Sequence, residues 1–249
     1  MTRPMSASSR CVLPEVLDGL EADDPRGRRS RRDLRRVHAA MRSDSILLRA
    51  VAKLRLTTQP RRILELGAGD GTLLLRFARA QRPRWIGVDL TLLDRLDLVS
   101  EGTRAAYRGL GWRVAVERAD ALEWAAEPRE RHYDLCFANL FLHHFDAAPL
   151  ATLLRSVAAS TDALVACEPR RSALARLGSR LVVLLGANDV TREDAVKSVA
   201  AGFAGRELST AWTPAEGRWI VEEFPALPFT HCFTAVRANP RTAGSKHGL

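Results

Sequence analysis

The sequence has few cysteines and no long apolar run. These two absences argue against a disulfide-rich protein and against a membrane-spanning one. Its 249 residues include four cysteines, Cys11, Cys136, Cys167 and Cys232, which are far apart along the chain. This spacing suggests neither a disulfide framework nor a zinc cluster. No apolar run approaches the roughly 20 residues needed to cross a bilayer, and residues 1–10 are polar, with no apolar signal segment behind them. We therefore expect a soluble, cytoplasmic protein without a membrane span.

The chain is also short of acidic charge, but the imbalance is local. It carries 38 basic and 29 acidic residues, a formal net charge of +9. Residues 25–36 hold seven arginines and one aspartate, and the segment from Arg237 onward holds three basic residues and no acid. The rest of the chain is balanced, so the charge does not indicate a basic catalytic domain. For residues 25–36 we favour a helix with a solvated basic face; a contact with nucleic acid or an anionic surface is the alternative.

A short apolar run that ends in glycines predicts a ligand-binding turn. Residues 62–66 have the composition of a buried strand, and residues 72–80 have the apolar periodicity of a helix. The turn between them reads Gly67-Ala68-Gly69-Asp70-Gly71. Glycines there leave room for a ligand, and the backbone N–H groups that open the next helix can hold an anionic group such as a carboxylate.

An acidic residue follows each of the next two predicted strands. The apolar segment at residues 85–88 ends in Asp89, which would place a carboxylate at the tip of a second strand, where it can accept both hydroxyls of a ribose. A third predicted strand, residues 113–118, leads into Asp120, which can accept a hydrogen bond from an adenine amino group. The order of these groups along the chain predicts a nucleoside site.

With these residues the chain resembles the class I S-adenosylmethionine-dependent methyltransferases over roughly residues 45 to 237. The family's glycine motif appears at residues 65–71, its ribose acid as Asp89, its adenine acid as Asp120 and its fourth strand at residues 133–139. The resemblance implies S-adenosylmethionine as the cofactor, with Glu65 orienting the glycine loop and the methionine end. It implies cofactor contacts by Glu65, Gly67, Ala68, Gly69, Asp70, Gly71, Asp89, Leu90, Asp120, Ala121 and Asn139.

A nicotinamide-binding oxidoreductase is the main competing interpretation, because it also places glycines after a first strand and an acid after the second. The glycines here follow the pattern G-x-G-x-G, with Thr72 where the dinucleotide fingerprint has its last glycine. Asp120 has no role in that fingerprint. A tight turn without a ligand is the remaining alternative.

The residues after the fourth strand are candidates for the methyl acceptor site, since ligands occupy the crevice beyond the carboxyl ends of parallel strands. Residues 139–145 lack the two prolines and the aromatic residue that are frequent in enzymes that methylate nucleic-acid bases. They are similar to the quinone-biosynthesis and small-molecule branches of the family, where a histidine pair is frequent. Histidine can remove a proton from a hydroxyl near neutral pH, so we predict that His143 or His144 is catalytic. A structural role for both is the alternative.

The residues after the fifth strand are candidates for substrate contacts. The strand at residues 163–167 is followed by Glu168, Pro169, Arg170 and Arg171. Either arginine could pair with a phenolate or carboxylate, because its planar donors suit oxygen anions. An ion pair between Glu168 and an arginine that fixes the loop is the alternative. We predict no metal, because the acceptor side has no carboxylate cluster of the kind that holds magnesium.

A helical insertion at about residues 172–205 is predicted to form the roof over the acceptor, and its apolar content favours a lipophilic substrate. Together with residues 139–145 and 168–171, it is similar to bacterial methyltransferases that accompany type III polyketide synthases. That resemblance implies a phenolic or quinone-like acceptor and O-methylation. A nucleic-acid methyltransferase and a non-catalytic cofactor-binding protein remain as alternatives.

The predicted fold is α/β: a Rossmann-like, seven-stranded, mostly parallel sheet with helices on both faces. Residues 1–58 form an N-terminal helical cap, residues 59–237 the class I methyltransferase domain, and residues 238–249 a flexible basic tail. Residues 219–223 and 230–236 are predicted to close the sheet as an antiparallel hairpin.

Overall fold

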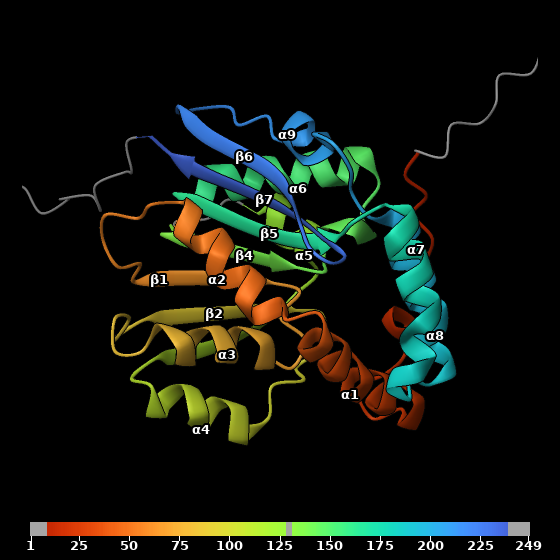
Figure 1. The fold of residues 1–249 in the computed structure, drawn as a ribbon. Coiled ribbons are helices and arrows are strands. Elements are labelled where there is room, and N and C mark those ends of the chain that lie inside the picture. Colours follow the sequence, from red (N-terminus) through yellow and green to blue (C-terminus); the bar gives the residue numbers. More distant parts are fainter. Residues whose placement is uncertain (1–8, 128–130, 239–249) are drawn as a thin grey trace, which may run out of the picture.

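Seven strands of the described residues form one sheet at the centre of the molecule (Figure 1). The structure is a computed structural model that describes residues 9–127 and 131–238. The strands are β1 (Arg62–Leu66), β2 (Asp89–Asp94), β3 (Arg113–Arg118), β4 (Leu135–Asn139), β5 (Ala163–Pro169), β6 (Trp219–Ala226) and β7 (Thr230–Arg237).

The order across the sheet is β3-β2-β1-β4-β5-β7-β6, and only β7 runs against the other strands. The chain moves outward in one direction from β1 to β3 and then returns to the other side of β1 with β4. Such a reversal of strand order leaves a crevice beyond the carboxyl ends of β1 and β4, where α/β proteins bind their ligands. The predicted sheet and its closing hairpin are confirmed.

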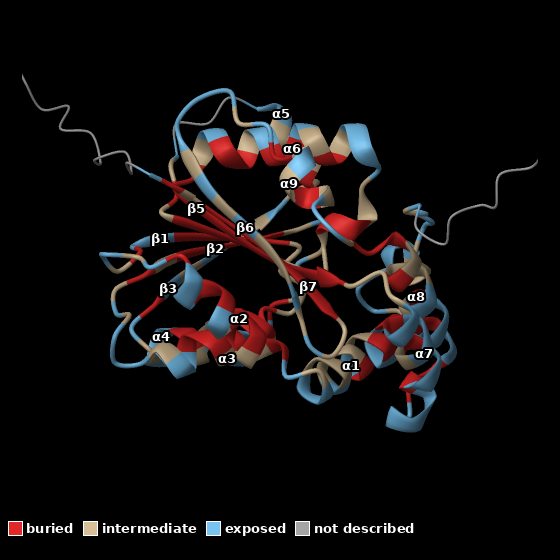
Figure 2. Ribbon diagram, turned by 45° about the horizontal axis from the view of Figure 1, so that its top comes forward, coloured by how far each residue is buried: buried red, intermediate tan, exposed pale blue. Residues whose placement is uncertain are grey.

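Helices cover both faces of the sheet, and a third group lies beyond its carboxyl edge (Figures 1 and 2). One face carries α2, α3 and α4, and the other carries α5, α6 and α9, while α1, α7 and α8 form the third group. The helices are α1 (Pro25–Ala40), α2 (Ser43–Lys53), α3 (Thr72–Gln81), α4 (Glu101–Gly109), α5 (Ala121–Ala126), α6 (Ala147–Ser160), α7 (Ala173–Arg180), α8 (Asp189–Ala201) and α9 (Glu207–Ala211), with 3-10 helices η1 (Leu17–Gly19), η2 (Leu142–His144) and η3 (Leu181–Leu185).

Apolar patterning explains the layers. All residues of β5 are buried, as expected for a strand that is covered on both faces. One apolar core lies under α2, α3 and α4, and a second lies under α5, α6 and α9. The buried side of α2, including Ile46 and Leu47, belongs to the first core, so this part of the predicted cap packs directly on the sheet.

Polar contacts hold the third group of helices together. The Asp24 side chain caps α1 by accepting from two backbone N–H groups, and Pro25 occupies the first turn, where a missing N–H costs little. Asn188 caps α8 and also donates to the Arg26 carbonyl, and its own N–H donates to buried Asp33. These contacts join α1 to the insertion after β5, although more than 150 residues separate them in sequence.

One expectation about local structure is wrong. The second strand does not end at Asp89 but begins there, after Gly87 has turned the chain with a φ of +64°. The run of buried residues that marks this strand lies at Leu90–Leu93, five residues later than the predicted segment 85–88. Although far apart along the chain, Cys167 and Cys232 are neighbours in the sheet: β5 and β7 place their Sγ atoms at 3.7 Å, as two free buried thiols.

No helix in the part of the chain that the structure describes has both the length and the apolar character needed to cross a bilayer. Residues 239–249 of the predicted basic tail lie outside the described residues.

Candidate functional site

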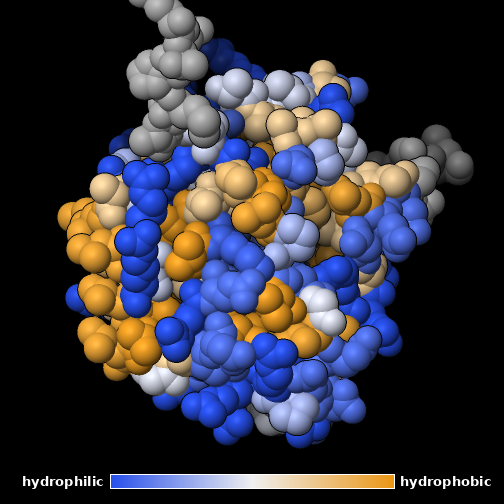
Figure 3. Space-filling model, turned by 90° about the vertical axis from the view of Figure 1, so that its right-hand side faces the viewer, coloured by the Kyte–Doolittle hydropathy of each residue, from blue (hydrophilic) through white to orange (hydrophobic). Residues whose placement is uncertain are grey.

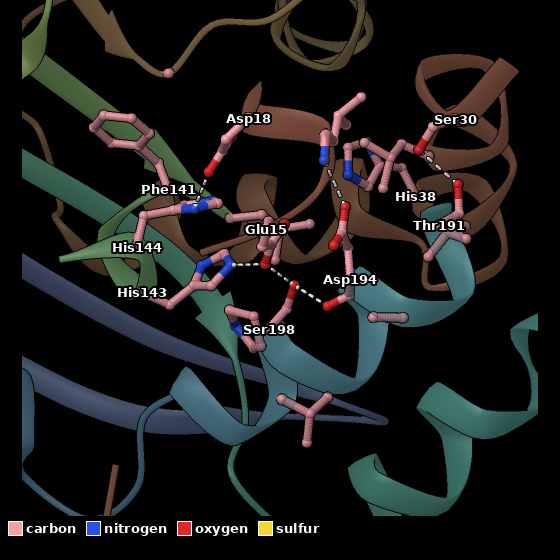
Figure 4. Close-up of a pocket in the computed structure, with 18 of the residues that line it drawn as sticks. Glu15, Asp18, Ser30, His38, Phe141, His143, His144, Thr191, Asp194 and Ser198 are labelled. Atoms are coloured by element: carbon pink, nitrogen blue, oxygen red, sulfur yellow. Dashed lines mark hydrogen bonds and ion pairs between the residues drawn. The ribbon is translucent and has the colours of Figure 1, made fainter. Parts of the chain in front are cut away.

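A cavity of about 690 Å³ lies beyond the carboxyl ends of β1, β2 and β4 (Figure 4). This volume is within the range of about 300–1,000 Å³ that is usual for ligand pockets. One side, which we call the strand wall, consists of residues that follow the strands: Gly67, Leu93, Asp94, Arg95, Ala119, Asp120 and Ala121. The other side, the helical wall, comes from residues 15–41, from the segment 140–145 and from the insertion after β5.

The glycine loop connects β1 to α3 at the strand wall. Gly67, Gly69 and Gly71 all have positive φ angles, which L side chains rarely adopt. A Cβ atom at Gly67 would lie 2.2 Å from the ring of Phe141, so no side chain fits there. A Cβ atom at Gly69 would meet nothing within 4 Å, so the loop borders open space at that point.

Asp94, which the sequence analysis missed, occupies the position predicted for Asp89. It is the last residue of β2, and its carboxylate accepts from Gly69 N–H at 2.8 Å and from Leu96 N–H at 3.1 Å. Asp89 lies at the opposite edge of the sheet and forms an exposed ion pair with Arg113, at 2.5 Å. The predicted cofactor contact of Asp89 is therefore wrong, because the strand is one full length out of place. Leu90 is buried within β2 and does not line the cavity.

Asp120 and Ala121 complete the strand wall, in the predicted place. Asp120 follows β3 and caps α5 by accepting from Leu122 N–H at 2.7 Å. One carboxylate oxygen thus holds the helix, and the side chain also lines the cavity. Glu65, Ala68, Gly69, Asp70, Gly71 and Asn139 lie around this wall but are not among the residues that line the cavity.

Two buried polar atoms near the glycine loop have no hydrogen-bond partner among the described residues: Glu65 Oε2 and His38 Nε2. Burial raises the pKa of Glu65 well above its usual range, and the nearby carboxylates Asp70 and Asp94 add to the effect. Burial lowers the pKa of His38, on α1, to about 4. Buried polar groups are normally hydrogen-bonded, and His38 lines the cavity, so a ligand in the cavity could supply a partner for His38 Nε2.

The basic helix α1 reaches the glycine loop. Arg35 donates to Asp70 at 2.8 Å, and Asp70 also accepts from Thr72 at the start of α3. His38 and Met41, further along α1, line the cavity. Thus α1 covers the cavity and fixes the loop, as the predicted cap would.

His143 and Glu168 form a buried network beneath the cavity. Glu168 is fully buried, and its carboxylate accepts from the N–H groups of Phe141 and Leu142 at 3.1 and 2.9 Å. The same carboxylate lies 2.8 Å from His143 Nδ1, while Nε2 of this histidine lies 3.3 Å from Glu15 Oε1. Glu168 therefore holds the loop after β4 in place.

The charge of His143 follows from these contacts. Burial alone would lower its pKa, but the hydrogen bonds to Glu15 and Glu168 outweigh burial and raise the pKa to about 9. A histidine that keeps its proton at neutral pH, with both ring nitrogens bonded, cannot accept another proton. This geometry argues against His143 as the base and gives it a structural role.

His144 has the opposite surroundings. Its Nδ1 lies 3.0 Å from Asp18 Oδ2, its side chain is 23% exposed, and it lines the cavity. Burial would raise the pKa of Asp18, but the hydrogen bond from His144 and the charges of His144 and Arg95 lower it. None of the described residues bonds Nε2 of His144. An aspartate at one ring nitrogen with the other nitrogen facing a cavity is the arrangement of a general base.

A segment that the sequence analysis overlooked supplies both carboxylates that face the histidines. Glu15 and Asp18 lie in residues 9–24, which pack across the cavity (Figure 4). Asp194 of α8 anchors this segment by accepting from Val16 and Leu17 N–H at 2.8 and 2.9 Å, and Ser198 donates to Glu15. An isolated acid in an irregular segment has no sequence signature, so only the fold could identify these residues.

The predicted substrate residues after β5 do not reach the cavity. Arg171 donates to both carboxylate oxygens of Glu207 on α9 and to the Gly202 carbonyl. Arg170 forms backbone contacts with Phe229 and Phe203. Glu168 is turned toward the loop after β4 and pairs with a histidine, not with an arginine. The strand ends at Pro169, two residues later than predicted, and Glu168, Arg170 and Arg171 are not among the residues that line the cavity.

Glu15, His143 and His144 could be considered as metal ligands, since one potential ligand atom from each lies within 4.8 Å of the others. Both ring nitrogens of His143 are engaged by carboxylates, and His144 is engaged by Asp18. These hydrogen bonds account for the positions of the three side chains without a metal.

Comparisons with known proteins agree with this geometry. Residues 63–162 match the family model for a methyltransferase domain. No curated protein sequence matches the chain significantly. The matched residues include the glycine loop, Asp94, Asp120 and the histidine pair.

Solved structures share the fold. The plantazolicin methyltransferase BamL, in complex with a triazolic desmethylPZN analog and SAH, has a TM-score of 0.60 at 14% identity, covering 85% of this chain and 90% of that one. An O-methyltransferase family protein from Burkholderia thailandensis has a TM-score of 0.54 at 18% identity, covering 87% of this chain but 61% of that one. For the mitomycin 7-O-methyltransferase MmcR the TM-score is 0.55 at 18% identity, with coverage of 89% and 60%. This chain has the Rossmann-like methyltransferase fold and spans less than two thirds of the last two proteins.

Proposed function

We propose that this protein transfers the methyl group of S-adenosylmethionine to the oxygen atom of a small, lipophilic aromatic acceptor. Residues 63–162 match a methyltransferase domain, and the similar structure of BamL contains SAH, the product of that cofactor; both support an S-adenosylmethionine-dependent methyltransferase. The acceptor class and the oxygen target are the proposal. The Asp18–His144 pair, opposite the strand wall of one cavity, carries it.

The strand wall fits the cofactor. Asp94 and Asp120 follow neighbouring strands, so Asp94 would accept the ribose hydroxyls and Asp120 the adenine amino group. The open space at Gly69 leaves room for the methionine portion, whose ammonium group would be attracted by the nearby carboxylates. The unpartnered Glu65 Oε2 gives that end of the site an additional polar group. When bound, the cofactor supplies an electrophilic methyl group on a sulfonium sulfur.

The helical wall fits an apolar acceptor. Its side chains include Leu34, Val37, Met41, Phe145, Val182, Val199 and Phe229. Such a wall desolvates an aromatic ring, and Asp18 and His144 on the same wall leave polar partners for a hydroxyl on that ring. A phenolic or quinone-like ring, as the sequence resemblance implies, suits these surroundings.

His144 supplies the base for an oxygen acceptor. With Nδ1–H donating to Asp18, the free lone pair of Nε2 can take the proton of an acceptor hydroxyl as the new oxygen–carbon bond forms. Asp18 holds the ring in this tautomer and stabilises the resulting positive charge. Alignment of donor and acceptor by the two walls supplies the remaining rate enhancement.

Most arginines of residues 25–36 already have a hydrogen-bond or ion-pair partner within the protein. Arg26 and Arg35 pair with Asp189 and Asp70, Arg36 pairs with Asp33, and Arg31 donates to three backbone carbonyls. These contacts explain much of the charge at residues 25–36 without a nucleic acid. They favour a small-molecule acceptor over the nucleic-acid alternative.

Product analysis with isotopically labelled cofactor tests the proposal. The full chain is incubated with a panel of apolar phenols, quinols and transfer RNA, and mass spectrometry locates the label. We expect a labelled methyl group on the oxygen of one or more phenols or quinols. Labelled RNA, or labelled products only on carbon or nitrogen, would contradict the proposed acceptor while leaving methyl transfer intact.

A further inference from the structure

The insertion after β5 exposes an unusual number of apolar side chains. Six of them are at least 38% exposed and follow one another along α7 and η3; we call them the apolar face: Leu174, Leu177, Leu181, Val183, Leu184 and Leu185. Leu184 is the most exposed, at 78%. Figure 3 views the side of the molecule on which α7 and α8 lie, and apolar side chains gather there beside hydrophilic ones. Contiguous apolar surface of this kind usually marks an interaction site.

Arginines border the apolar face. Arg176 and Arg180 are exposed on α7, four residues apart and therefore on the same side of the helix. Arg192, exposed on α8, lies with Arg180 around a depression that also includes Val196, Asp189 and Glu193. The two carboxylates pair with other cations, Asp189 with Arg26 and Glu193 with Lys197. Arg36 of α1 extends to the end of η3, since its Nη1 would be 3.4 Å from a Cβ atom at Gly186. Among the described residues, no carboxylate pairs with Arg176, Arg180 or Arg192.

The apolar face continues into the cavity. Leu181, Leu184 and Leu185 line the cavity and are exposed to solvent at the same time. Val182, between them in sequence, is buried and also lines the cavity. A hydrophobic molecule could therefore pass from the outer surface into the cavity without crossing a polar surface.

We propose that the apolar face and its arginines bind the surface of an anionic lipid membrane. Leucines insert between lipid chains at the interface, while neighbouring arginines reach the negatively charged headgroups. A second copy of this chain would fit less well, because docking two such faces would bring their arginines together. A nucleic acid would pair with the arginines but would leave the leucines exposed to water.

Membrane binding through this surface would place the mouth of the cavity against the lipid phase, which matters for the proposed function. A lipophilic phenol partitions into membranes, so the enzyme would draw its acceptor from the bilayer. That consequence rests on the proposed function, whereas membrane binding itself does not require an acceptor and can be measured without one.

Vesicle flotation tests the membrane surface directly. The full chain is mixed with vesicles of phosphatidylcholine, with or without phosphatidylglycerol. We expect binding to the anionic vesicles that weakens with added salt, and at least about tenfold weaker partitioning to the neutral ones. Absence of binding to anionic vesicles, or equal binding to both, would overturn the proposal.

Two double variants separate the apolar from the charged contribution. Leu174→Glu with Leu177→Glu is expected to lower partitioning about tenfold or more, and Arg176→Gln with Arg180→Gln about tenfold. The matched control is Ile86→Glu with Ile220→Glu, which changes two exposed residues, 56% and 59% exposed, at the amino-terminal edge of the sheet. This control should bind vesicles like the unmodified protein, apart from the charge change shared with the first variant.

Three further measurements make the test decisive. SAH affinity by calorimetry should be unchanged in Leu174→Glu with Leu177→Glu, which shows that a loss of vesicle binding is not unfolding. Equal loss of vesicle binding in the Ile86 and Ile220 control would overturn the proposal. So would a dimer in solution that the Leu174 and Leu177 variant dissociates, or RNA binding that only the arginine variant abolishes.

Discussion

The two walls of the cavity are built in different ways. The strand wall comes from one stretch, residues 67–121, in which each ligand-facing residue directly follows a strand or caps a helix. The helical wall is assembled from residues 15–41, 140–145 and 169–229, which meet only in the folded protein. Residues that bind a cofactor shared by many enzymes can lie directly at the ends of the strands. Residues that bind one particular acceptor lie on the helices and loops that surround the sheet.

The walls also differ in their polar groups. On the strand wall, Asp94 and Asp120 each accept a backbone N–H bond, so their positions are set by the main chain. On the helical wall, Glu15 and Asp18 are positioned by side-chain contacts to His143 and His144. Substitutions should therefore separate cofactor binding from acceptor chemistry.

The largest expected effect is on acceptor chemistry alone. His144→Gln removes the base and should lower the rate of methyl transfer to a hydroxyl acceptor about 10²- to 10⁴-fold, with SAH affinity unchanged within about twofold. His132→Gln is the matched control, because His132 is also 23% exposed and pairs with Asp162 outside the cavity. Full activity of His144→Gln in single-turnover assays would contradict the assignment of acceptor chemistry to the helical wall.

The second effect concerns stability and pH. The pKa of His143 rises from about 6.5 in the unfolded chain to about 9 in the folded protein. Its contribution to the free energy of unfolding is therefore fully present below pH 6.5 and is lost as the pH rises through 9. The difference corresponds to about 3 kcal/mol. Urea unfolding of the unmodified protein should therefore show a loss of about this size between pH 6.5 and pH 9.5 that is absent from His143→Gln. Parallel pH profiles of the two proteins would mean that His143 is neutral in the fold.

A third change probes the strand wall. Asp94→Ala removes charge-assisted hydrogen bonds to the ribose and should raise the dissociation constant of SAH about 100-fold by calorimetry. Asp89→Ala is the matched control and should change it by less than about twofold, because Asp89 lies at the far edge of the sheet. Melting curves of both variants show whether the fold is kept. The reverse order of effects would restore Asp89 as the ribose residue.

The smallest effect sharpens the role of the N-terminal segment. Asp18→Asn keeps the shape of the side chain but loses the charge that holds the His144 tautomer. Because Asp18 is 42% exposed, solvent screens part of its charge, and we expect about a tenfold lower rate of methyl transfer rather than the larger loss of a fully buried pair. The rate loss should appear at saturating cofactor, since Asp18 pairs with His144 of the helical wall. An unchanged rate would assign Asp18 to folding only.

Prediction from the sequence was reliable where a function depends on backbone geometry. The glycine loop and Asp120 lie where they were expected, because glycine is required by positive φ and because a cap follows the third strand. The prediction for Asp89 was wrong because an aspartate stands at each end of β2, Asp89 at its start and Asp94 at its end. Placing the strand about one strand length too early put Asp89 at the end that Asp94 occupies. Periodicity alone does not show which end of an apolar segment faces the crevice.

For the helical wall, the sequence indicated which types of residue take part but not which residues they contact. The predicted histidine pair lines the cavity, yet which member pairs with Glu168 and which with Asp18 depends on residues more than 20 positions away. Arg170 and Arg171 were expected near the acceptor, but Arg171 pairs with Glu207 on α9. Long side chains find their partners only after the helices have packed.

By itself the sequence determined the class of fold, the glycine turn that borders the cavity and the presence of an apolar insertion, since each depends on local backbone preference or on the spacing of apolar residues. Only the tertiary structure decided that Asp94 faces the cavity, that His143 is held between two carboxylates and that His144 is free to face the cavity. Charge and protonation depend on distances between segments that are remote along the chain, and those distances exist only once the segments pack against one another.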